Sequence, residues 1–179
     1  MNDSLQPGDP DNSAMTQDQR DSLAWTLWSG NLFDAFWAHQ MGEVERILDD
    51  VPDHSATPLL AAMSTCGAYA RIRCSDALGV ESETAPVFVI SLRDDIEVPR
   101  AVRLAVTIMN AGTLFDHDSF RAAVAVALGA LPPEPSAVET PLPGEVFFND
   151  MVREIISAAQ VIVEEAHRFL HEHGVDPHV

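Results

Sequence analysis

Apolar residues recur every three or four positions along most of the chain, which is the spacing of helices that bury one face. This periodicity predicts a mainly α protein, a helical bundle of about six helices. Thr16 followed by Gln19 fits a capping box at the start of the first helix, and Pro52 ends the second. We expect the helices over about 17–28, 31–51, 59–70, 99–112, 119–129 and 145–172.

Glycines are expected to punctuate this pattern in two places. Ser29, Gly30 and Asn31 supply a break and a new N-cap between the first two predicted helices. Gly112 is placed to end the fourth helix in a left-handed C-cap.

The stretch 69–92 is ambiguous. Residues 87–92 are short, rich in β-branched side chains and bounded by Pro86, which suits a buried strand as well as a helix. A single strand cannot satisfy its backbone groups, and the only candidate partner is 69–74, where apolar and polar residues alternate. The sequence therefore leaves open either a short β-hairpin of 69–74 with 87–92 or an all-helical protein.

Composition divides the chain into four parts. Residues 1–15 are acidic and almost free of apolar side chains, which predicts a disordered tail. A helical domain follows over 16–130, and five prolines within 131–144 predict an extended linker. The last part, 145–173, is expected to be a long helix that packs on the domain or on a second copy.

This last helix carries an apolar seam with steps of three and four residues, a pattern typical of helices that pack along their length. The seam alone does not distinguish packing within the chain from packing in a homodimer. Ile156, Val161, Val163 and Leu170 lie outside it, and this wider apolar surface favours the homodimer. The seam consists of Phe148, Val152, Ile155, Ala159, Ile162, Ala166 and Phe169.

All three tryptophans fall within a short stretch near the start of the helical domain. Aromatic side chains dominate both cores and binding interfaces, so two interpretations are open. The cluster is either the nucleus of the core or a docking groove for a protein partner. Its candidate interaction residues are Trp25, Trp28, Phe33 and Trp37.

The charge of the chain narrows the possible functions. Twenty-eight acidic residues oppose ten basic ones, all of them arginine, which gives a net charge of −18 over 179 residues. A chain without lysine cannot form a lysine Schiff base or place a P-loop lysine on a phosphate. The acidity disfavours direct binding to nucleic acid or to an anionic membrane. With no apolar stretch long enough to cross a bilayer and no secretory signal pattern, we expect a cytoplasmic protein.

One group of side chains has the spacing of metal ligands. Glu164, His167 and His171 stack on one face of the last helix, but that face points away from the seam. They form either a solvated polar face or a surface metal site. Asp116, His117 and Asp118 are more simply read as a helix N-cap than as an acid–base group.

No catalytic motif and no cofactor is indicated, so the first hypothesis is a non-enzymatic, acidic protein-interaction or regulatory module with a protein partner that carries basic charge. The second is a DNA mimic whose carboxylates occupy the basic groove of a nucleic-acid-binding protein. The third is a metal-assisted enzyme that uses Glu164, His167 and His171. The acids that a DNA mimic would use form two clusters, Glu43, Glu45, Asp49, Asp50 and Asp53, and Glu81, Glu83, Asp94, Asp95 and Glu97.

Overall fold

A computed structural model describes residues 16–52, 55–93, 95–131 and 143–178. The chain is mainly α, as the periodicity predicts, and no β-strand occurs within these ranges. The predicted tail over 1–15 and most of the predicted linker over 131–144 lie outside the described residues. The helices are α1 (Gln17–Trp37), α2 (Met41–Asp49), α3 (Ala56–Ser64), α4 (Cys66–Leu78), α5 (Arg100–Leu114), α6 (His117–Leu128) and α7 (Pro143–Glu172).

Helix α1 begins at the predicted capping box and runs through the predicted break. The Thr16 hydroxyl accepts from the Gln19 amide at 3.2 Å, and the Thr16 amide donates to the Gln19 side chain at 2.9 Å. The expected interruption at Ser29–Asn31 is wrong, because the helix continues to Trp37. A glycine within a helix costs only about 1 kcal/mol, and burial of the apolar side chains that follow Gly30 offsets this.

The real break comes at Ala38–Gln40. His39 adopts a positive φ of 54°, and the chain then turns back into α2.

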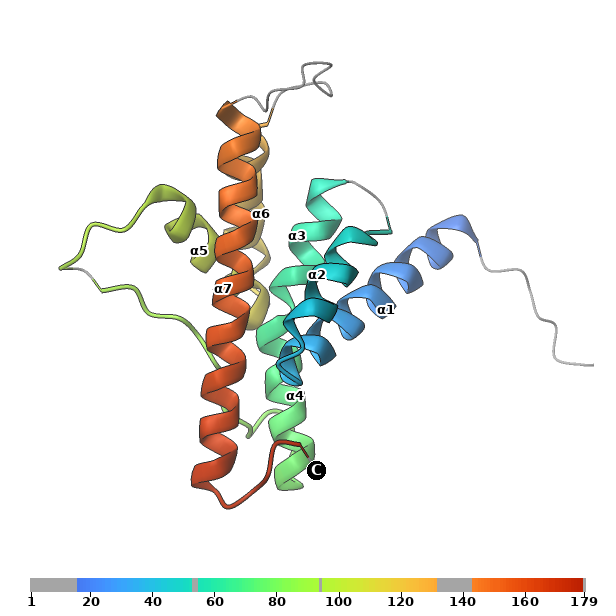
Figure 1. Ribbon diagram of the computed structural model, residues 1–179, viewed down its shortest axis with the longest axis vertical. Coiled ribbons are helices and arrows are strands. Elements are labelled where there is room, and N and C mark those ends of the chain that lie inside the picture. The colour runs from blue at the N-terminus through green and yellow to red at the C-terminus, as the bar shows by residue number, and fades with distance from the viewer. Residues whose placement is uncertain (1–15, 53–54, 94, 132–142, 179) are drawn as a thin grey trace, which may run out of the picture.

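The β-hairpin alternative is wrong, because residues 69–74 belong to α4. Cys66, Ala70 and Cys74 are spaced by four residues and are all buried, which is the pattern of one helix face. In the alternating strand pattern Ile72 would be buried with Ala70 and Cys74, but its side chain is 47% exposed. Residues 86–93 form neither helix nor strand, and Figure 1 shows this part of the chain as an uncoiled, extended run.

Helices α3, α4 and α5 approach one another closely through glycine. The predicted C-cap at Gly112 is wrong, since α5 ends in a left-handed cap at Phe115 with φ 55°. Gly112 instead lies inside α5, where a Cβ atom would overlap Ser64 of α3. Gly67 of α4 is packed in the same way against Thr113. These glycines therefore allow close helix contact.

Helix α7 is the central element of the bundle. It runs along the long axis of the molecule and packs mainly against α5 and α4 (Figure 1). The Cys66 and Cys74 thiols lie against its backbone, 3.9 Å from the Ala159 carbonyl and 4.0 Å from the Ala166 carbonyl. Burial raises the pKa of these thiols to about 12 and about 11, so both remain protonated at neutral pH.

No helix in the described part of the chain combines the length and the apolar character needed to cross a membrane.

Candidate functional site

The tryptophan cluster forms part of the core. Trp28, Phe33 and Trp37 are only 6%, 3% and 8% exposed. The Trp28 indole donates to the Ile47 carbonyl at 2.9 Å, and the Trp37 indole donates to the Pro177 carbonyl at 2.9 Å. Trp25 is half-buried, with its ring centroid 5.5 Å from that of Trp28. Burial therefore supports the core for Trp28, Phe33 and Trp37. Trp25 differs, because it lines an open surface groove of about 310 Å³ with Asp21 and Pro52.

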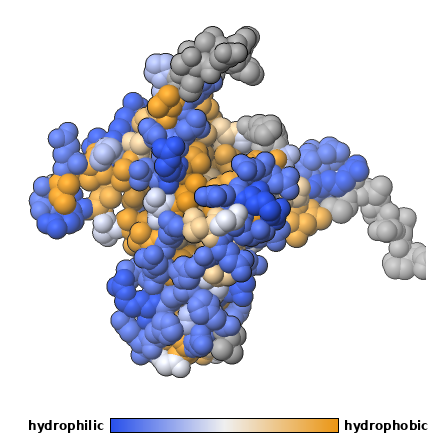
Figure 2. Space-filling view, in the orientation of Figure 1, coloured by the Kyte–Doolittle hydropathy of each residue, from blue (hydrophilic) through white to orange (hydrophobic). Residues whose placement is uncertain are grey.

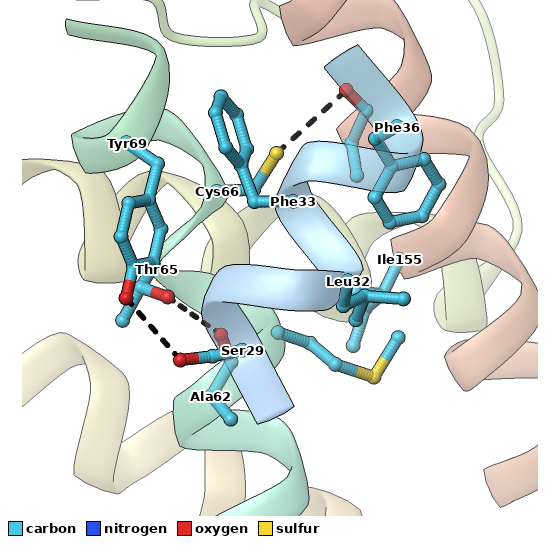
Figure 3. Close-up of a pocket in the computed structure, with 11 residues that line it drawn as sticks. Ser29, Leu32, Phe33, Phe36, Ala62, Thr65, Cys66, Tyr69 and Ile155 are labelled. Atoms are coloured by element: carbon cyan, nitrogen blue, oxygen red, sulfur yellow. Dashed lines mark hydrogen bonds between the residues drawn. The ribbon is translucent and has the colours of Figure 1, made fainter. Parts of the chain in front are cut away.

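A small cavity lies beneath α1, between α3, α4 and α7 (Figure 3). Ser29 and Tyr69 form its polar side, with their hydroxyl oxygens 3.3 Å apart, while Phe33, Phe36 and Ile155 close it with apolar groups. Its volume of about 10 Å³ suits a single water molecule at most. Ligand pockets are typically tens of times larger, so this cavity is a packing defect and not a binding site.

The seam of α7 is covered by the chain's own helices. Ile155 and Ile162 are buried in the core, and Phe148, Val152 and Phe169 are half-buried. Packing within one chain therefore accounts for the seam. The homodimer stays a prediction, with less apolar surface left to support it.

The three residues with metal-ligand spacing do not share a common setting. Glu164 and His171 are exposed, whereas His167 is buried at 7% exposure. The prediction that His167 lies on a solvated face of the last helix is wrong. The end of α1 and the chain after α7 cover that part of the helix. Within residues 16–52, 55–93, 95–131 and 143–178, no group of three or more histidine, cysteine or carboxylate side chains is arranged to hold a metal ion.

His167 belongs instead to a histidine cluster that the sequence analysis missed. His39 Nε2 lies 3.2 Å from His167 Nδ1, and the His178 ring lies 5.2 Å from the His167 ring. The rings come from the α1–α2 turn, from α7 and from the chain after α7, so no sequence spacing relates them. Burial, and then the neighbouring His39, lowers the pKa of His167 to about 4. The buried Nε2 of His167 has no hydrogen-bond partner within the described chain.

The Asp116 group acts as the helix cap that the sequence indicates. The Asp116 carboxylate accepts from the Ser119 amide at 3.1 Å. This hydrogen bonding lowers the pKa of Asp116.

The extended segment before α5 is held by one side chain. The Ile90 amide donates to Asn110 Oδ1 at 2.9 Å, and Asn110 Nδ2 donates to the Ile90 carbonyl at 2.8 Å. Asn110 lies on α5, so its amide group takes the place of a neighbouring strand at this residue. Phe88, on the same side as Ile90, packs against the Phe169 ring of α7 at 6.2 Å. The segment is therefore fixed to the bundle.

The other face of this segment is exposed and apolar. Val87 and Val89 are 41% and 46% exposed, and Val161 of α7 is 45% exposed. A surface groove of about 360 Å³ lies between the segment and α7, lined by residues 87–91 and by Val161, Ile162 and Glu165. Apolar atoms gather beside α7 on this side of the molecule (Figure 2). We call this surface, residues 87–91 with Val161 and Glu165, the edge groove.

Acidic side chains flank the edge groove along the sequence. Glu81 and Glu83 precede the extended segment and Glu97 follows it, all exposed. Within the described chain these three carboxylates form no ion pair, whereas Asp95 pairs with Arg93 at 2.6 Å. The segment that lines the edge groove is therefore preceded and followed in the sequence by exposed carboxylates that have no ion pair in the described chain.

Comparison with protein-family models, with curated proteins and with solved structures finds no match to this chain.

Proposed function

We propose that this chain is a non-enzymatic, acidic protein-interaction module that binds its partner at the edge groove. The observation that carries the proposal is the exposed extended segment 87–91, whose valine side chains line one open groove together with Val161 of α7. Exposed apolar surface next to an open groove marks interaction sites. The flanking carboxylates favour a partner with basic side chains.

The two alternative functions have less support. A DNA mimic needs carboxylates in a line, but Glu43 pairs with Arg46 and Asp95 pairs with Arg93, so each acidic cluster is interrupted by arginine. A metal-assisted enzyme at Glu164 and His171 would lack His167, which is turned into the histidine cluster.

The test compares two valines of similar exposure on different helices. Val161→Glu places a charge in the edge groove, while Val126→Glu places one on α6, where Val126 is 43% exposed. Each tagged protein is used to capture partners from native host lysate at low salt. We expect the wild type and Val126→Glu to retain the same partner and Val161→Glu to lose it.

Thermal melts of the three proteins provide the control, because all should unfold at nearly the same temperature. Retention of the partner by Val161→Glu would overturn the proposal. So would the absence of any specific partner for all three proteins.

A further inference from the structure

We infer that the edge groove binds an extended, basic peptide segment of the partner, which pairs with residues 87–91 as an added β-strand. This inference rests on the proposed function and specifies the class of partner. Its basis is the backbone geometry of the segment, the shape of the groove and the surrounding charge.

The backbone of the segment has one edge occupied and one edge free. In an extended chain the N–H and C=O groups of alternate residues point to opposite edges. Asn110 takes both groups of Ile90, so the edge shared by Val87, Val89 and Ser91 points the other way. None of these three residues makes a backbone hydrogen bond to another residue of the described chain. A free edge of this kind is a template for pairing with another strand.

The fixed position of the segment makes this edge suitable for binding. A flexible segment would lose conformational entropy when a partner ordered it, at about 1 to 2 kcal/mol per residue. Here the paired hydrogen bonds from Asn110 and the Phe88–Phe169 contact already hold the chain extended. A peptide therefore meets a preorganised strand.

The groove defines which side chains the peptide carries. Val87 and Val89 expose β-branched side chains, and Val161 and Ile162 line the α7 side. β-Branched residues at alternate peptide positions would pack against these groups. Glu165 lines the same groove and forms an exposed ion pair with Arg168 at 2.6 Å, which an incoming arginine can replace at little cost. The side chains at the intervening peptide positions point to the opposite face. Basic residues there complement the net charge of −18 of the chain.

Charge argues against occupants from this chain itself. Residues 1–15 contain Asp3, Asp9 and Asp11 without a basic residue, and residues 132–142 contain Glu134 and Glu139 without one. A second copy carries the same net charge of −18 and would be repelled. A basic segment of a different protein fits the groove better than any of these.

The experiment uses the full chain and synthetic peptides. The probe is a fluorescent octapeptide of alternating valine and arginine. One comparison peptide is N-methylated at every valine, and another has glutamate in place of arginine. We expect the parent peptide to bind with salt-sensitive affinity, the methylated peptide to bind at least about tenfold more weakly, and the glutamate peptide not to bind. Hydrogen exchange at the Val89 and Ser91 amides should slow when the parent peptide is bound.

A pair of variants tests the same edge from the protein side. Val89→Pro removes one N–H from the free edge and leaves the Asn110–Ile90 bonds in place, whereas Val89→Thr keeps that N–H. Val89→Pro should weaken binding of the parent peptide about tenfold, and Val89→Thr by less than about twofold. If Val89→Pro does not fold, the methylated peptide and the exchange measurement on the wild type decide the question.

The outcomes separate this inference from the proposed function. Equal binding of the parent and methylated peptides, or no protection of Val89 and Ser91, would overturn strand addition. No binding of the parent peptide would overturn the basic strand as the ligand class. In each case the lysate capture with Val161→Glu still tests the edge groove as an interaction surface. Concentration-dependent dimerisation blocked by Val89→Pro would instead identify a second copy as the occupant and overturn the inference.

Discussion

The indole of Trp37 donates a hydrogen bond to the carbonyl oxygen of Pro177, at 2.9 Å, between residues separated by 140 positions in the sequence. It ties the end of α1 to the chain that follows α7. The Val175 amide bonds to the Leu170 carbonyl at 3.0 Å and helps to turn that chain back over the helix. The end of the bundle near His39 is closed by these contacts.

Trp37→Phe should lower the free energy of unfolding by about 1 to 2 kcal/mol, because the ring is largely retained while the buried Pro177 carbonyl loses its donor. The measurement is urea denaturation followed by circular dichroism. Trp25→Phe is the matched control, because Trp25 is half-buried and its indole makes no hydrogen bond within the described chain. It should change stability by less than about 0.5 kcal/mol. An equal loss in both variants would contradict a specific role for the Trp37–Pro177 bond.

Acid should destabilise the protein through His167. The folded-state pKa of His167 is lowered from 6.5 to about 4, so the folded state binds fewer protons than the unfolded state between these values. Stability is then lost as the pH falls from about 6.5 to about 4, by about 2 to 3 kcal/mol. Burial is the largest cause of this lowered pKa, followed by the electrostatic effect of His39, His178 and His171, so the effect of these neighbours is already included in the value.

Urea denaturation of the wild type and His167→Gln across this pH range checks the prediction. His167→Gln should show a shallower fall in stability on acidification. His117→Gln, an exposed residue on α6, should follow the wild type. Parallel pH profiles for all three proteins would contradict the role of His167.

Asn110→Ala should release the extended segment from α5. It leaves the Ile90 amide and carbonyl without their partner, so hydrogen exchange across residues 87–92 should become faster. Global stability should fall by about 1 to 2 kcal/mol. Asn31→Ala, at an exposed position of α1, should leave exchange in this segment unchanged. Unaltered exchange in Asn110→Ala would show that the Phe88 contact alone holds the segment.

Two glycine-to-alanine substitutions should have opposite effects. Gly112→Ala places a methyl group against Ser64 and should destabilise the protein by about 1 to 3 kcal/mol. Gly30→Ala has open space around its added methyl group and should stabilise α1 by about 0.5 to 1 kcal/mol. Thermal denaturation of both variants measures the difference. A stabilising Gly112→Ala would contradict the close approach of α3 and α5.

The oligomeric state can be measured by light scattering on the full chain. The homodimer that the sequence favoured drew on apolar residues outside the seam, and Val163 and Leu170 among them are buried within one chain. The homodimer therefore stays a prediction that this measurement tests, with Val161 the residue outside the seam whose side chain is exposed. A dimer that Val161→Glu disrupts would show that α7 also contributes an intermolecular face. Removal of α7 is not a useful test, because it would remove part of the core.

The helices and several of their ends could be predicted from local sequence. The capping box at Thr16 and the cap at Asp116 depend on hydrogen bonds between residues three apart, so their signals are local. The predicted helix break at Gly30 and the predicted C-cap at Gly112 are wrong. Tertiary packing decides whether a glycine ends a helix or allows a neighbouring helix to approach closely.

The site was harder to predict than the fold. His39 and His167 meet across 128 residues, and Asn110 meets Ile90 across 20. The periodic pattern of apolar residues contains no information about contacts between residues so far apart in the sequence. The β-branched run at 87–92 indicated correctly that this stretch need not be helical, but the structure forms no strand there and its proposed hairpin partner, 69–74, belongs to α4. An asparagine side chain that replaces a strand leaves no pattern in the sequence.

The central position of α7 also affects how the protein reaches its native state. Helices α4 and α5 bury their inner faces against α7, which follows both of them in the sequence. During synthesis from the N-terminus, side chains such as Leu60, Ile108 and Met109 would lack their full cover until residues 143–170 had emerged. Until then the nascent chain would expose apolar surface of the kind that chaperones bind.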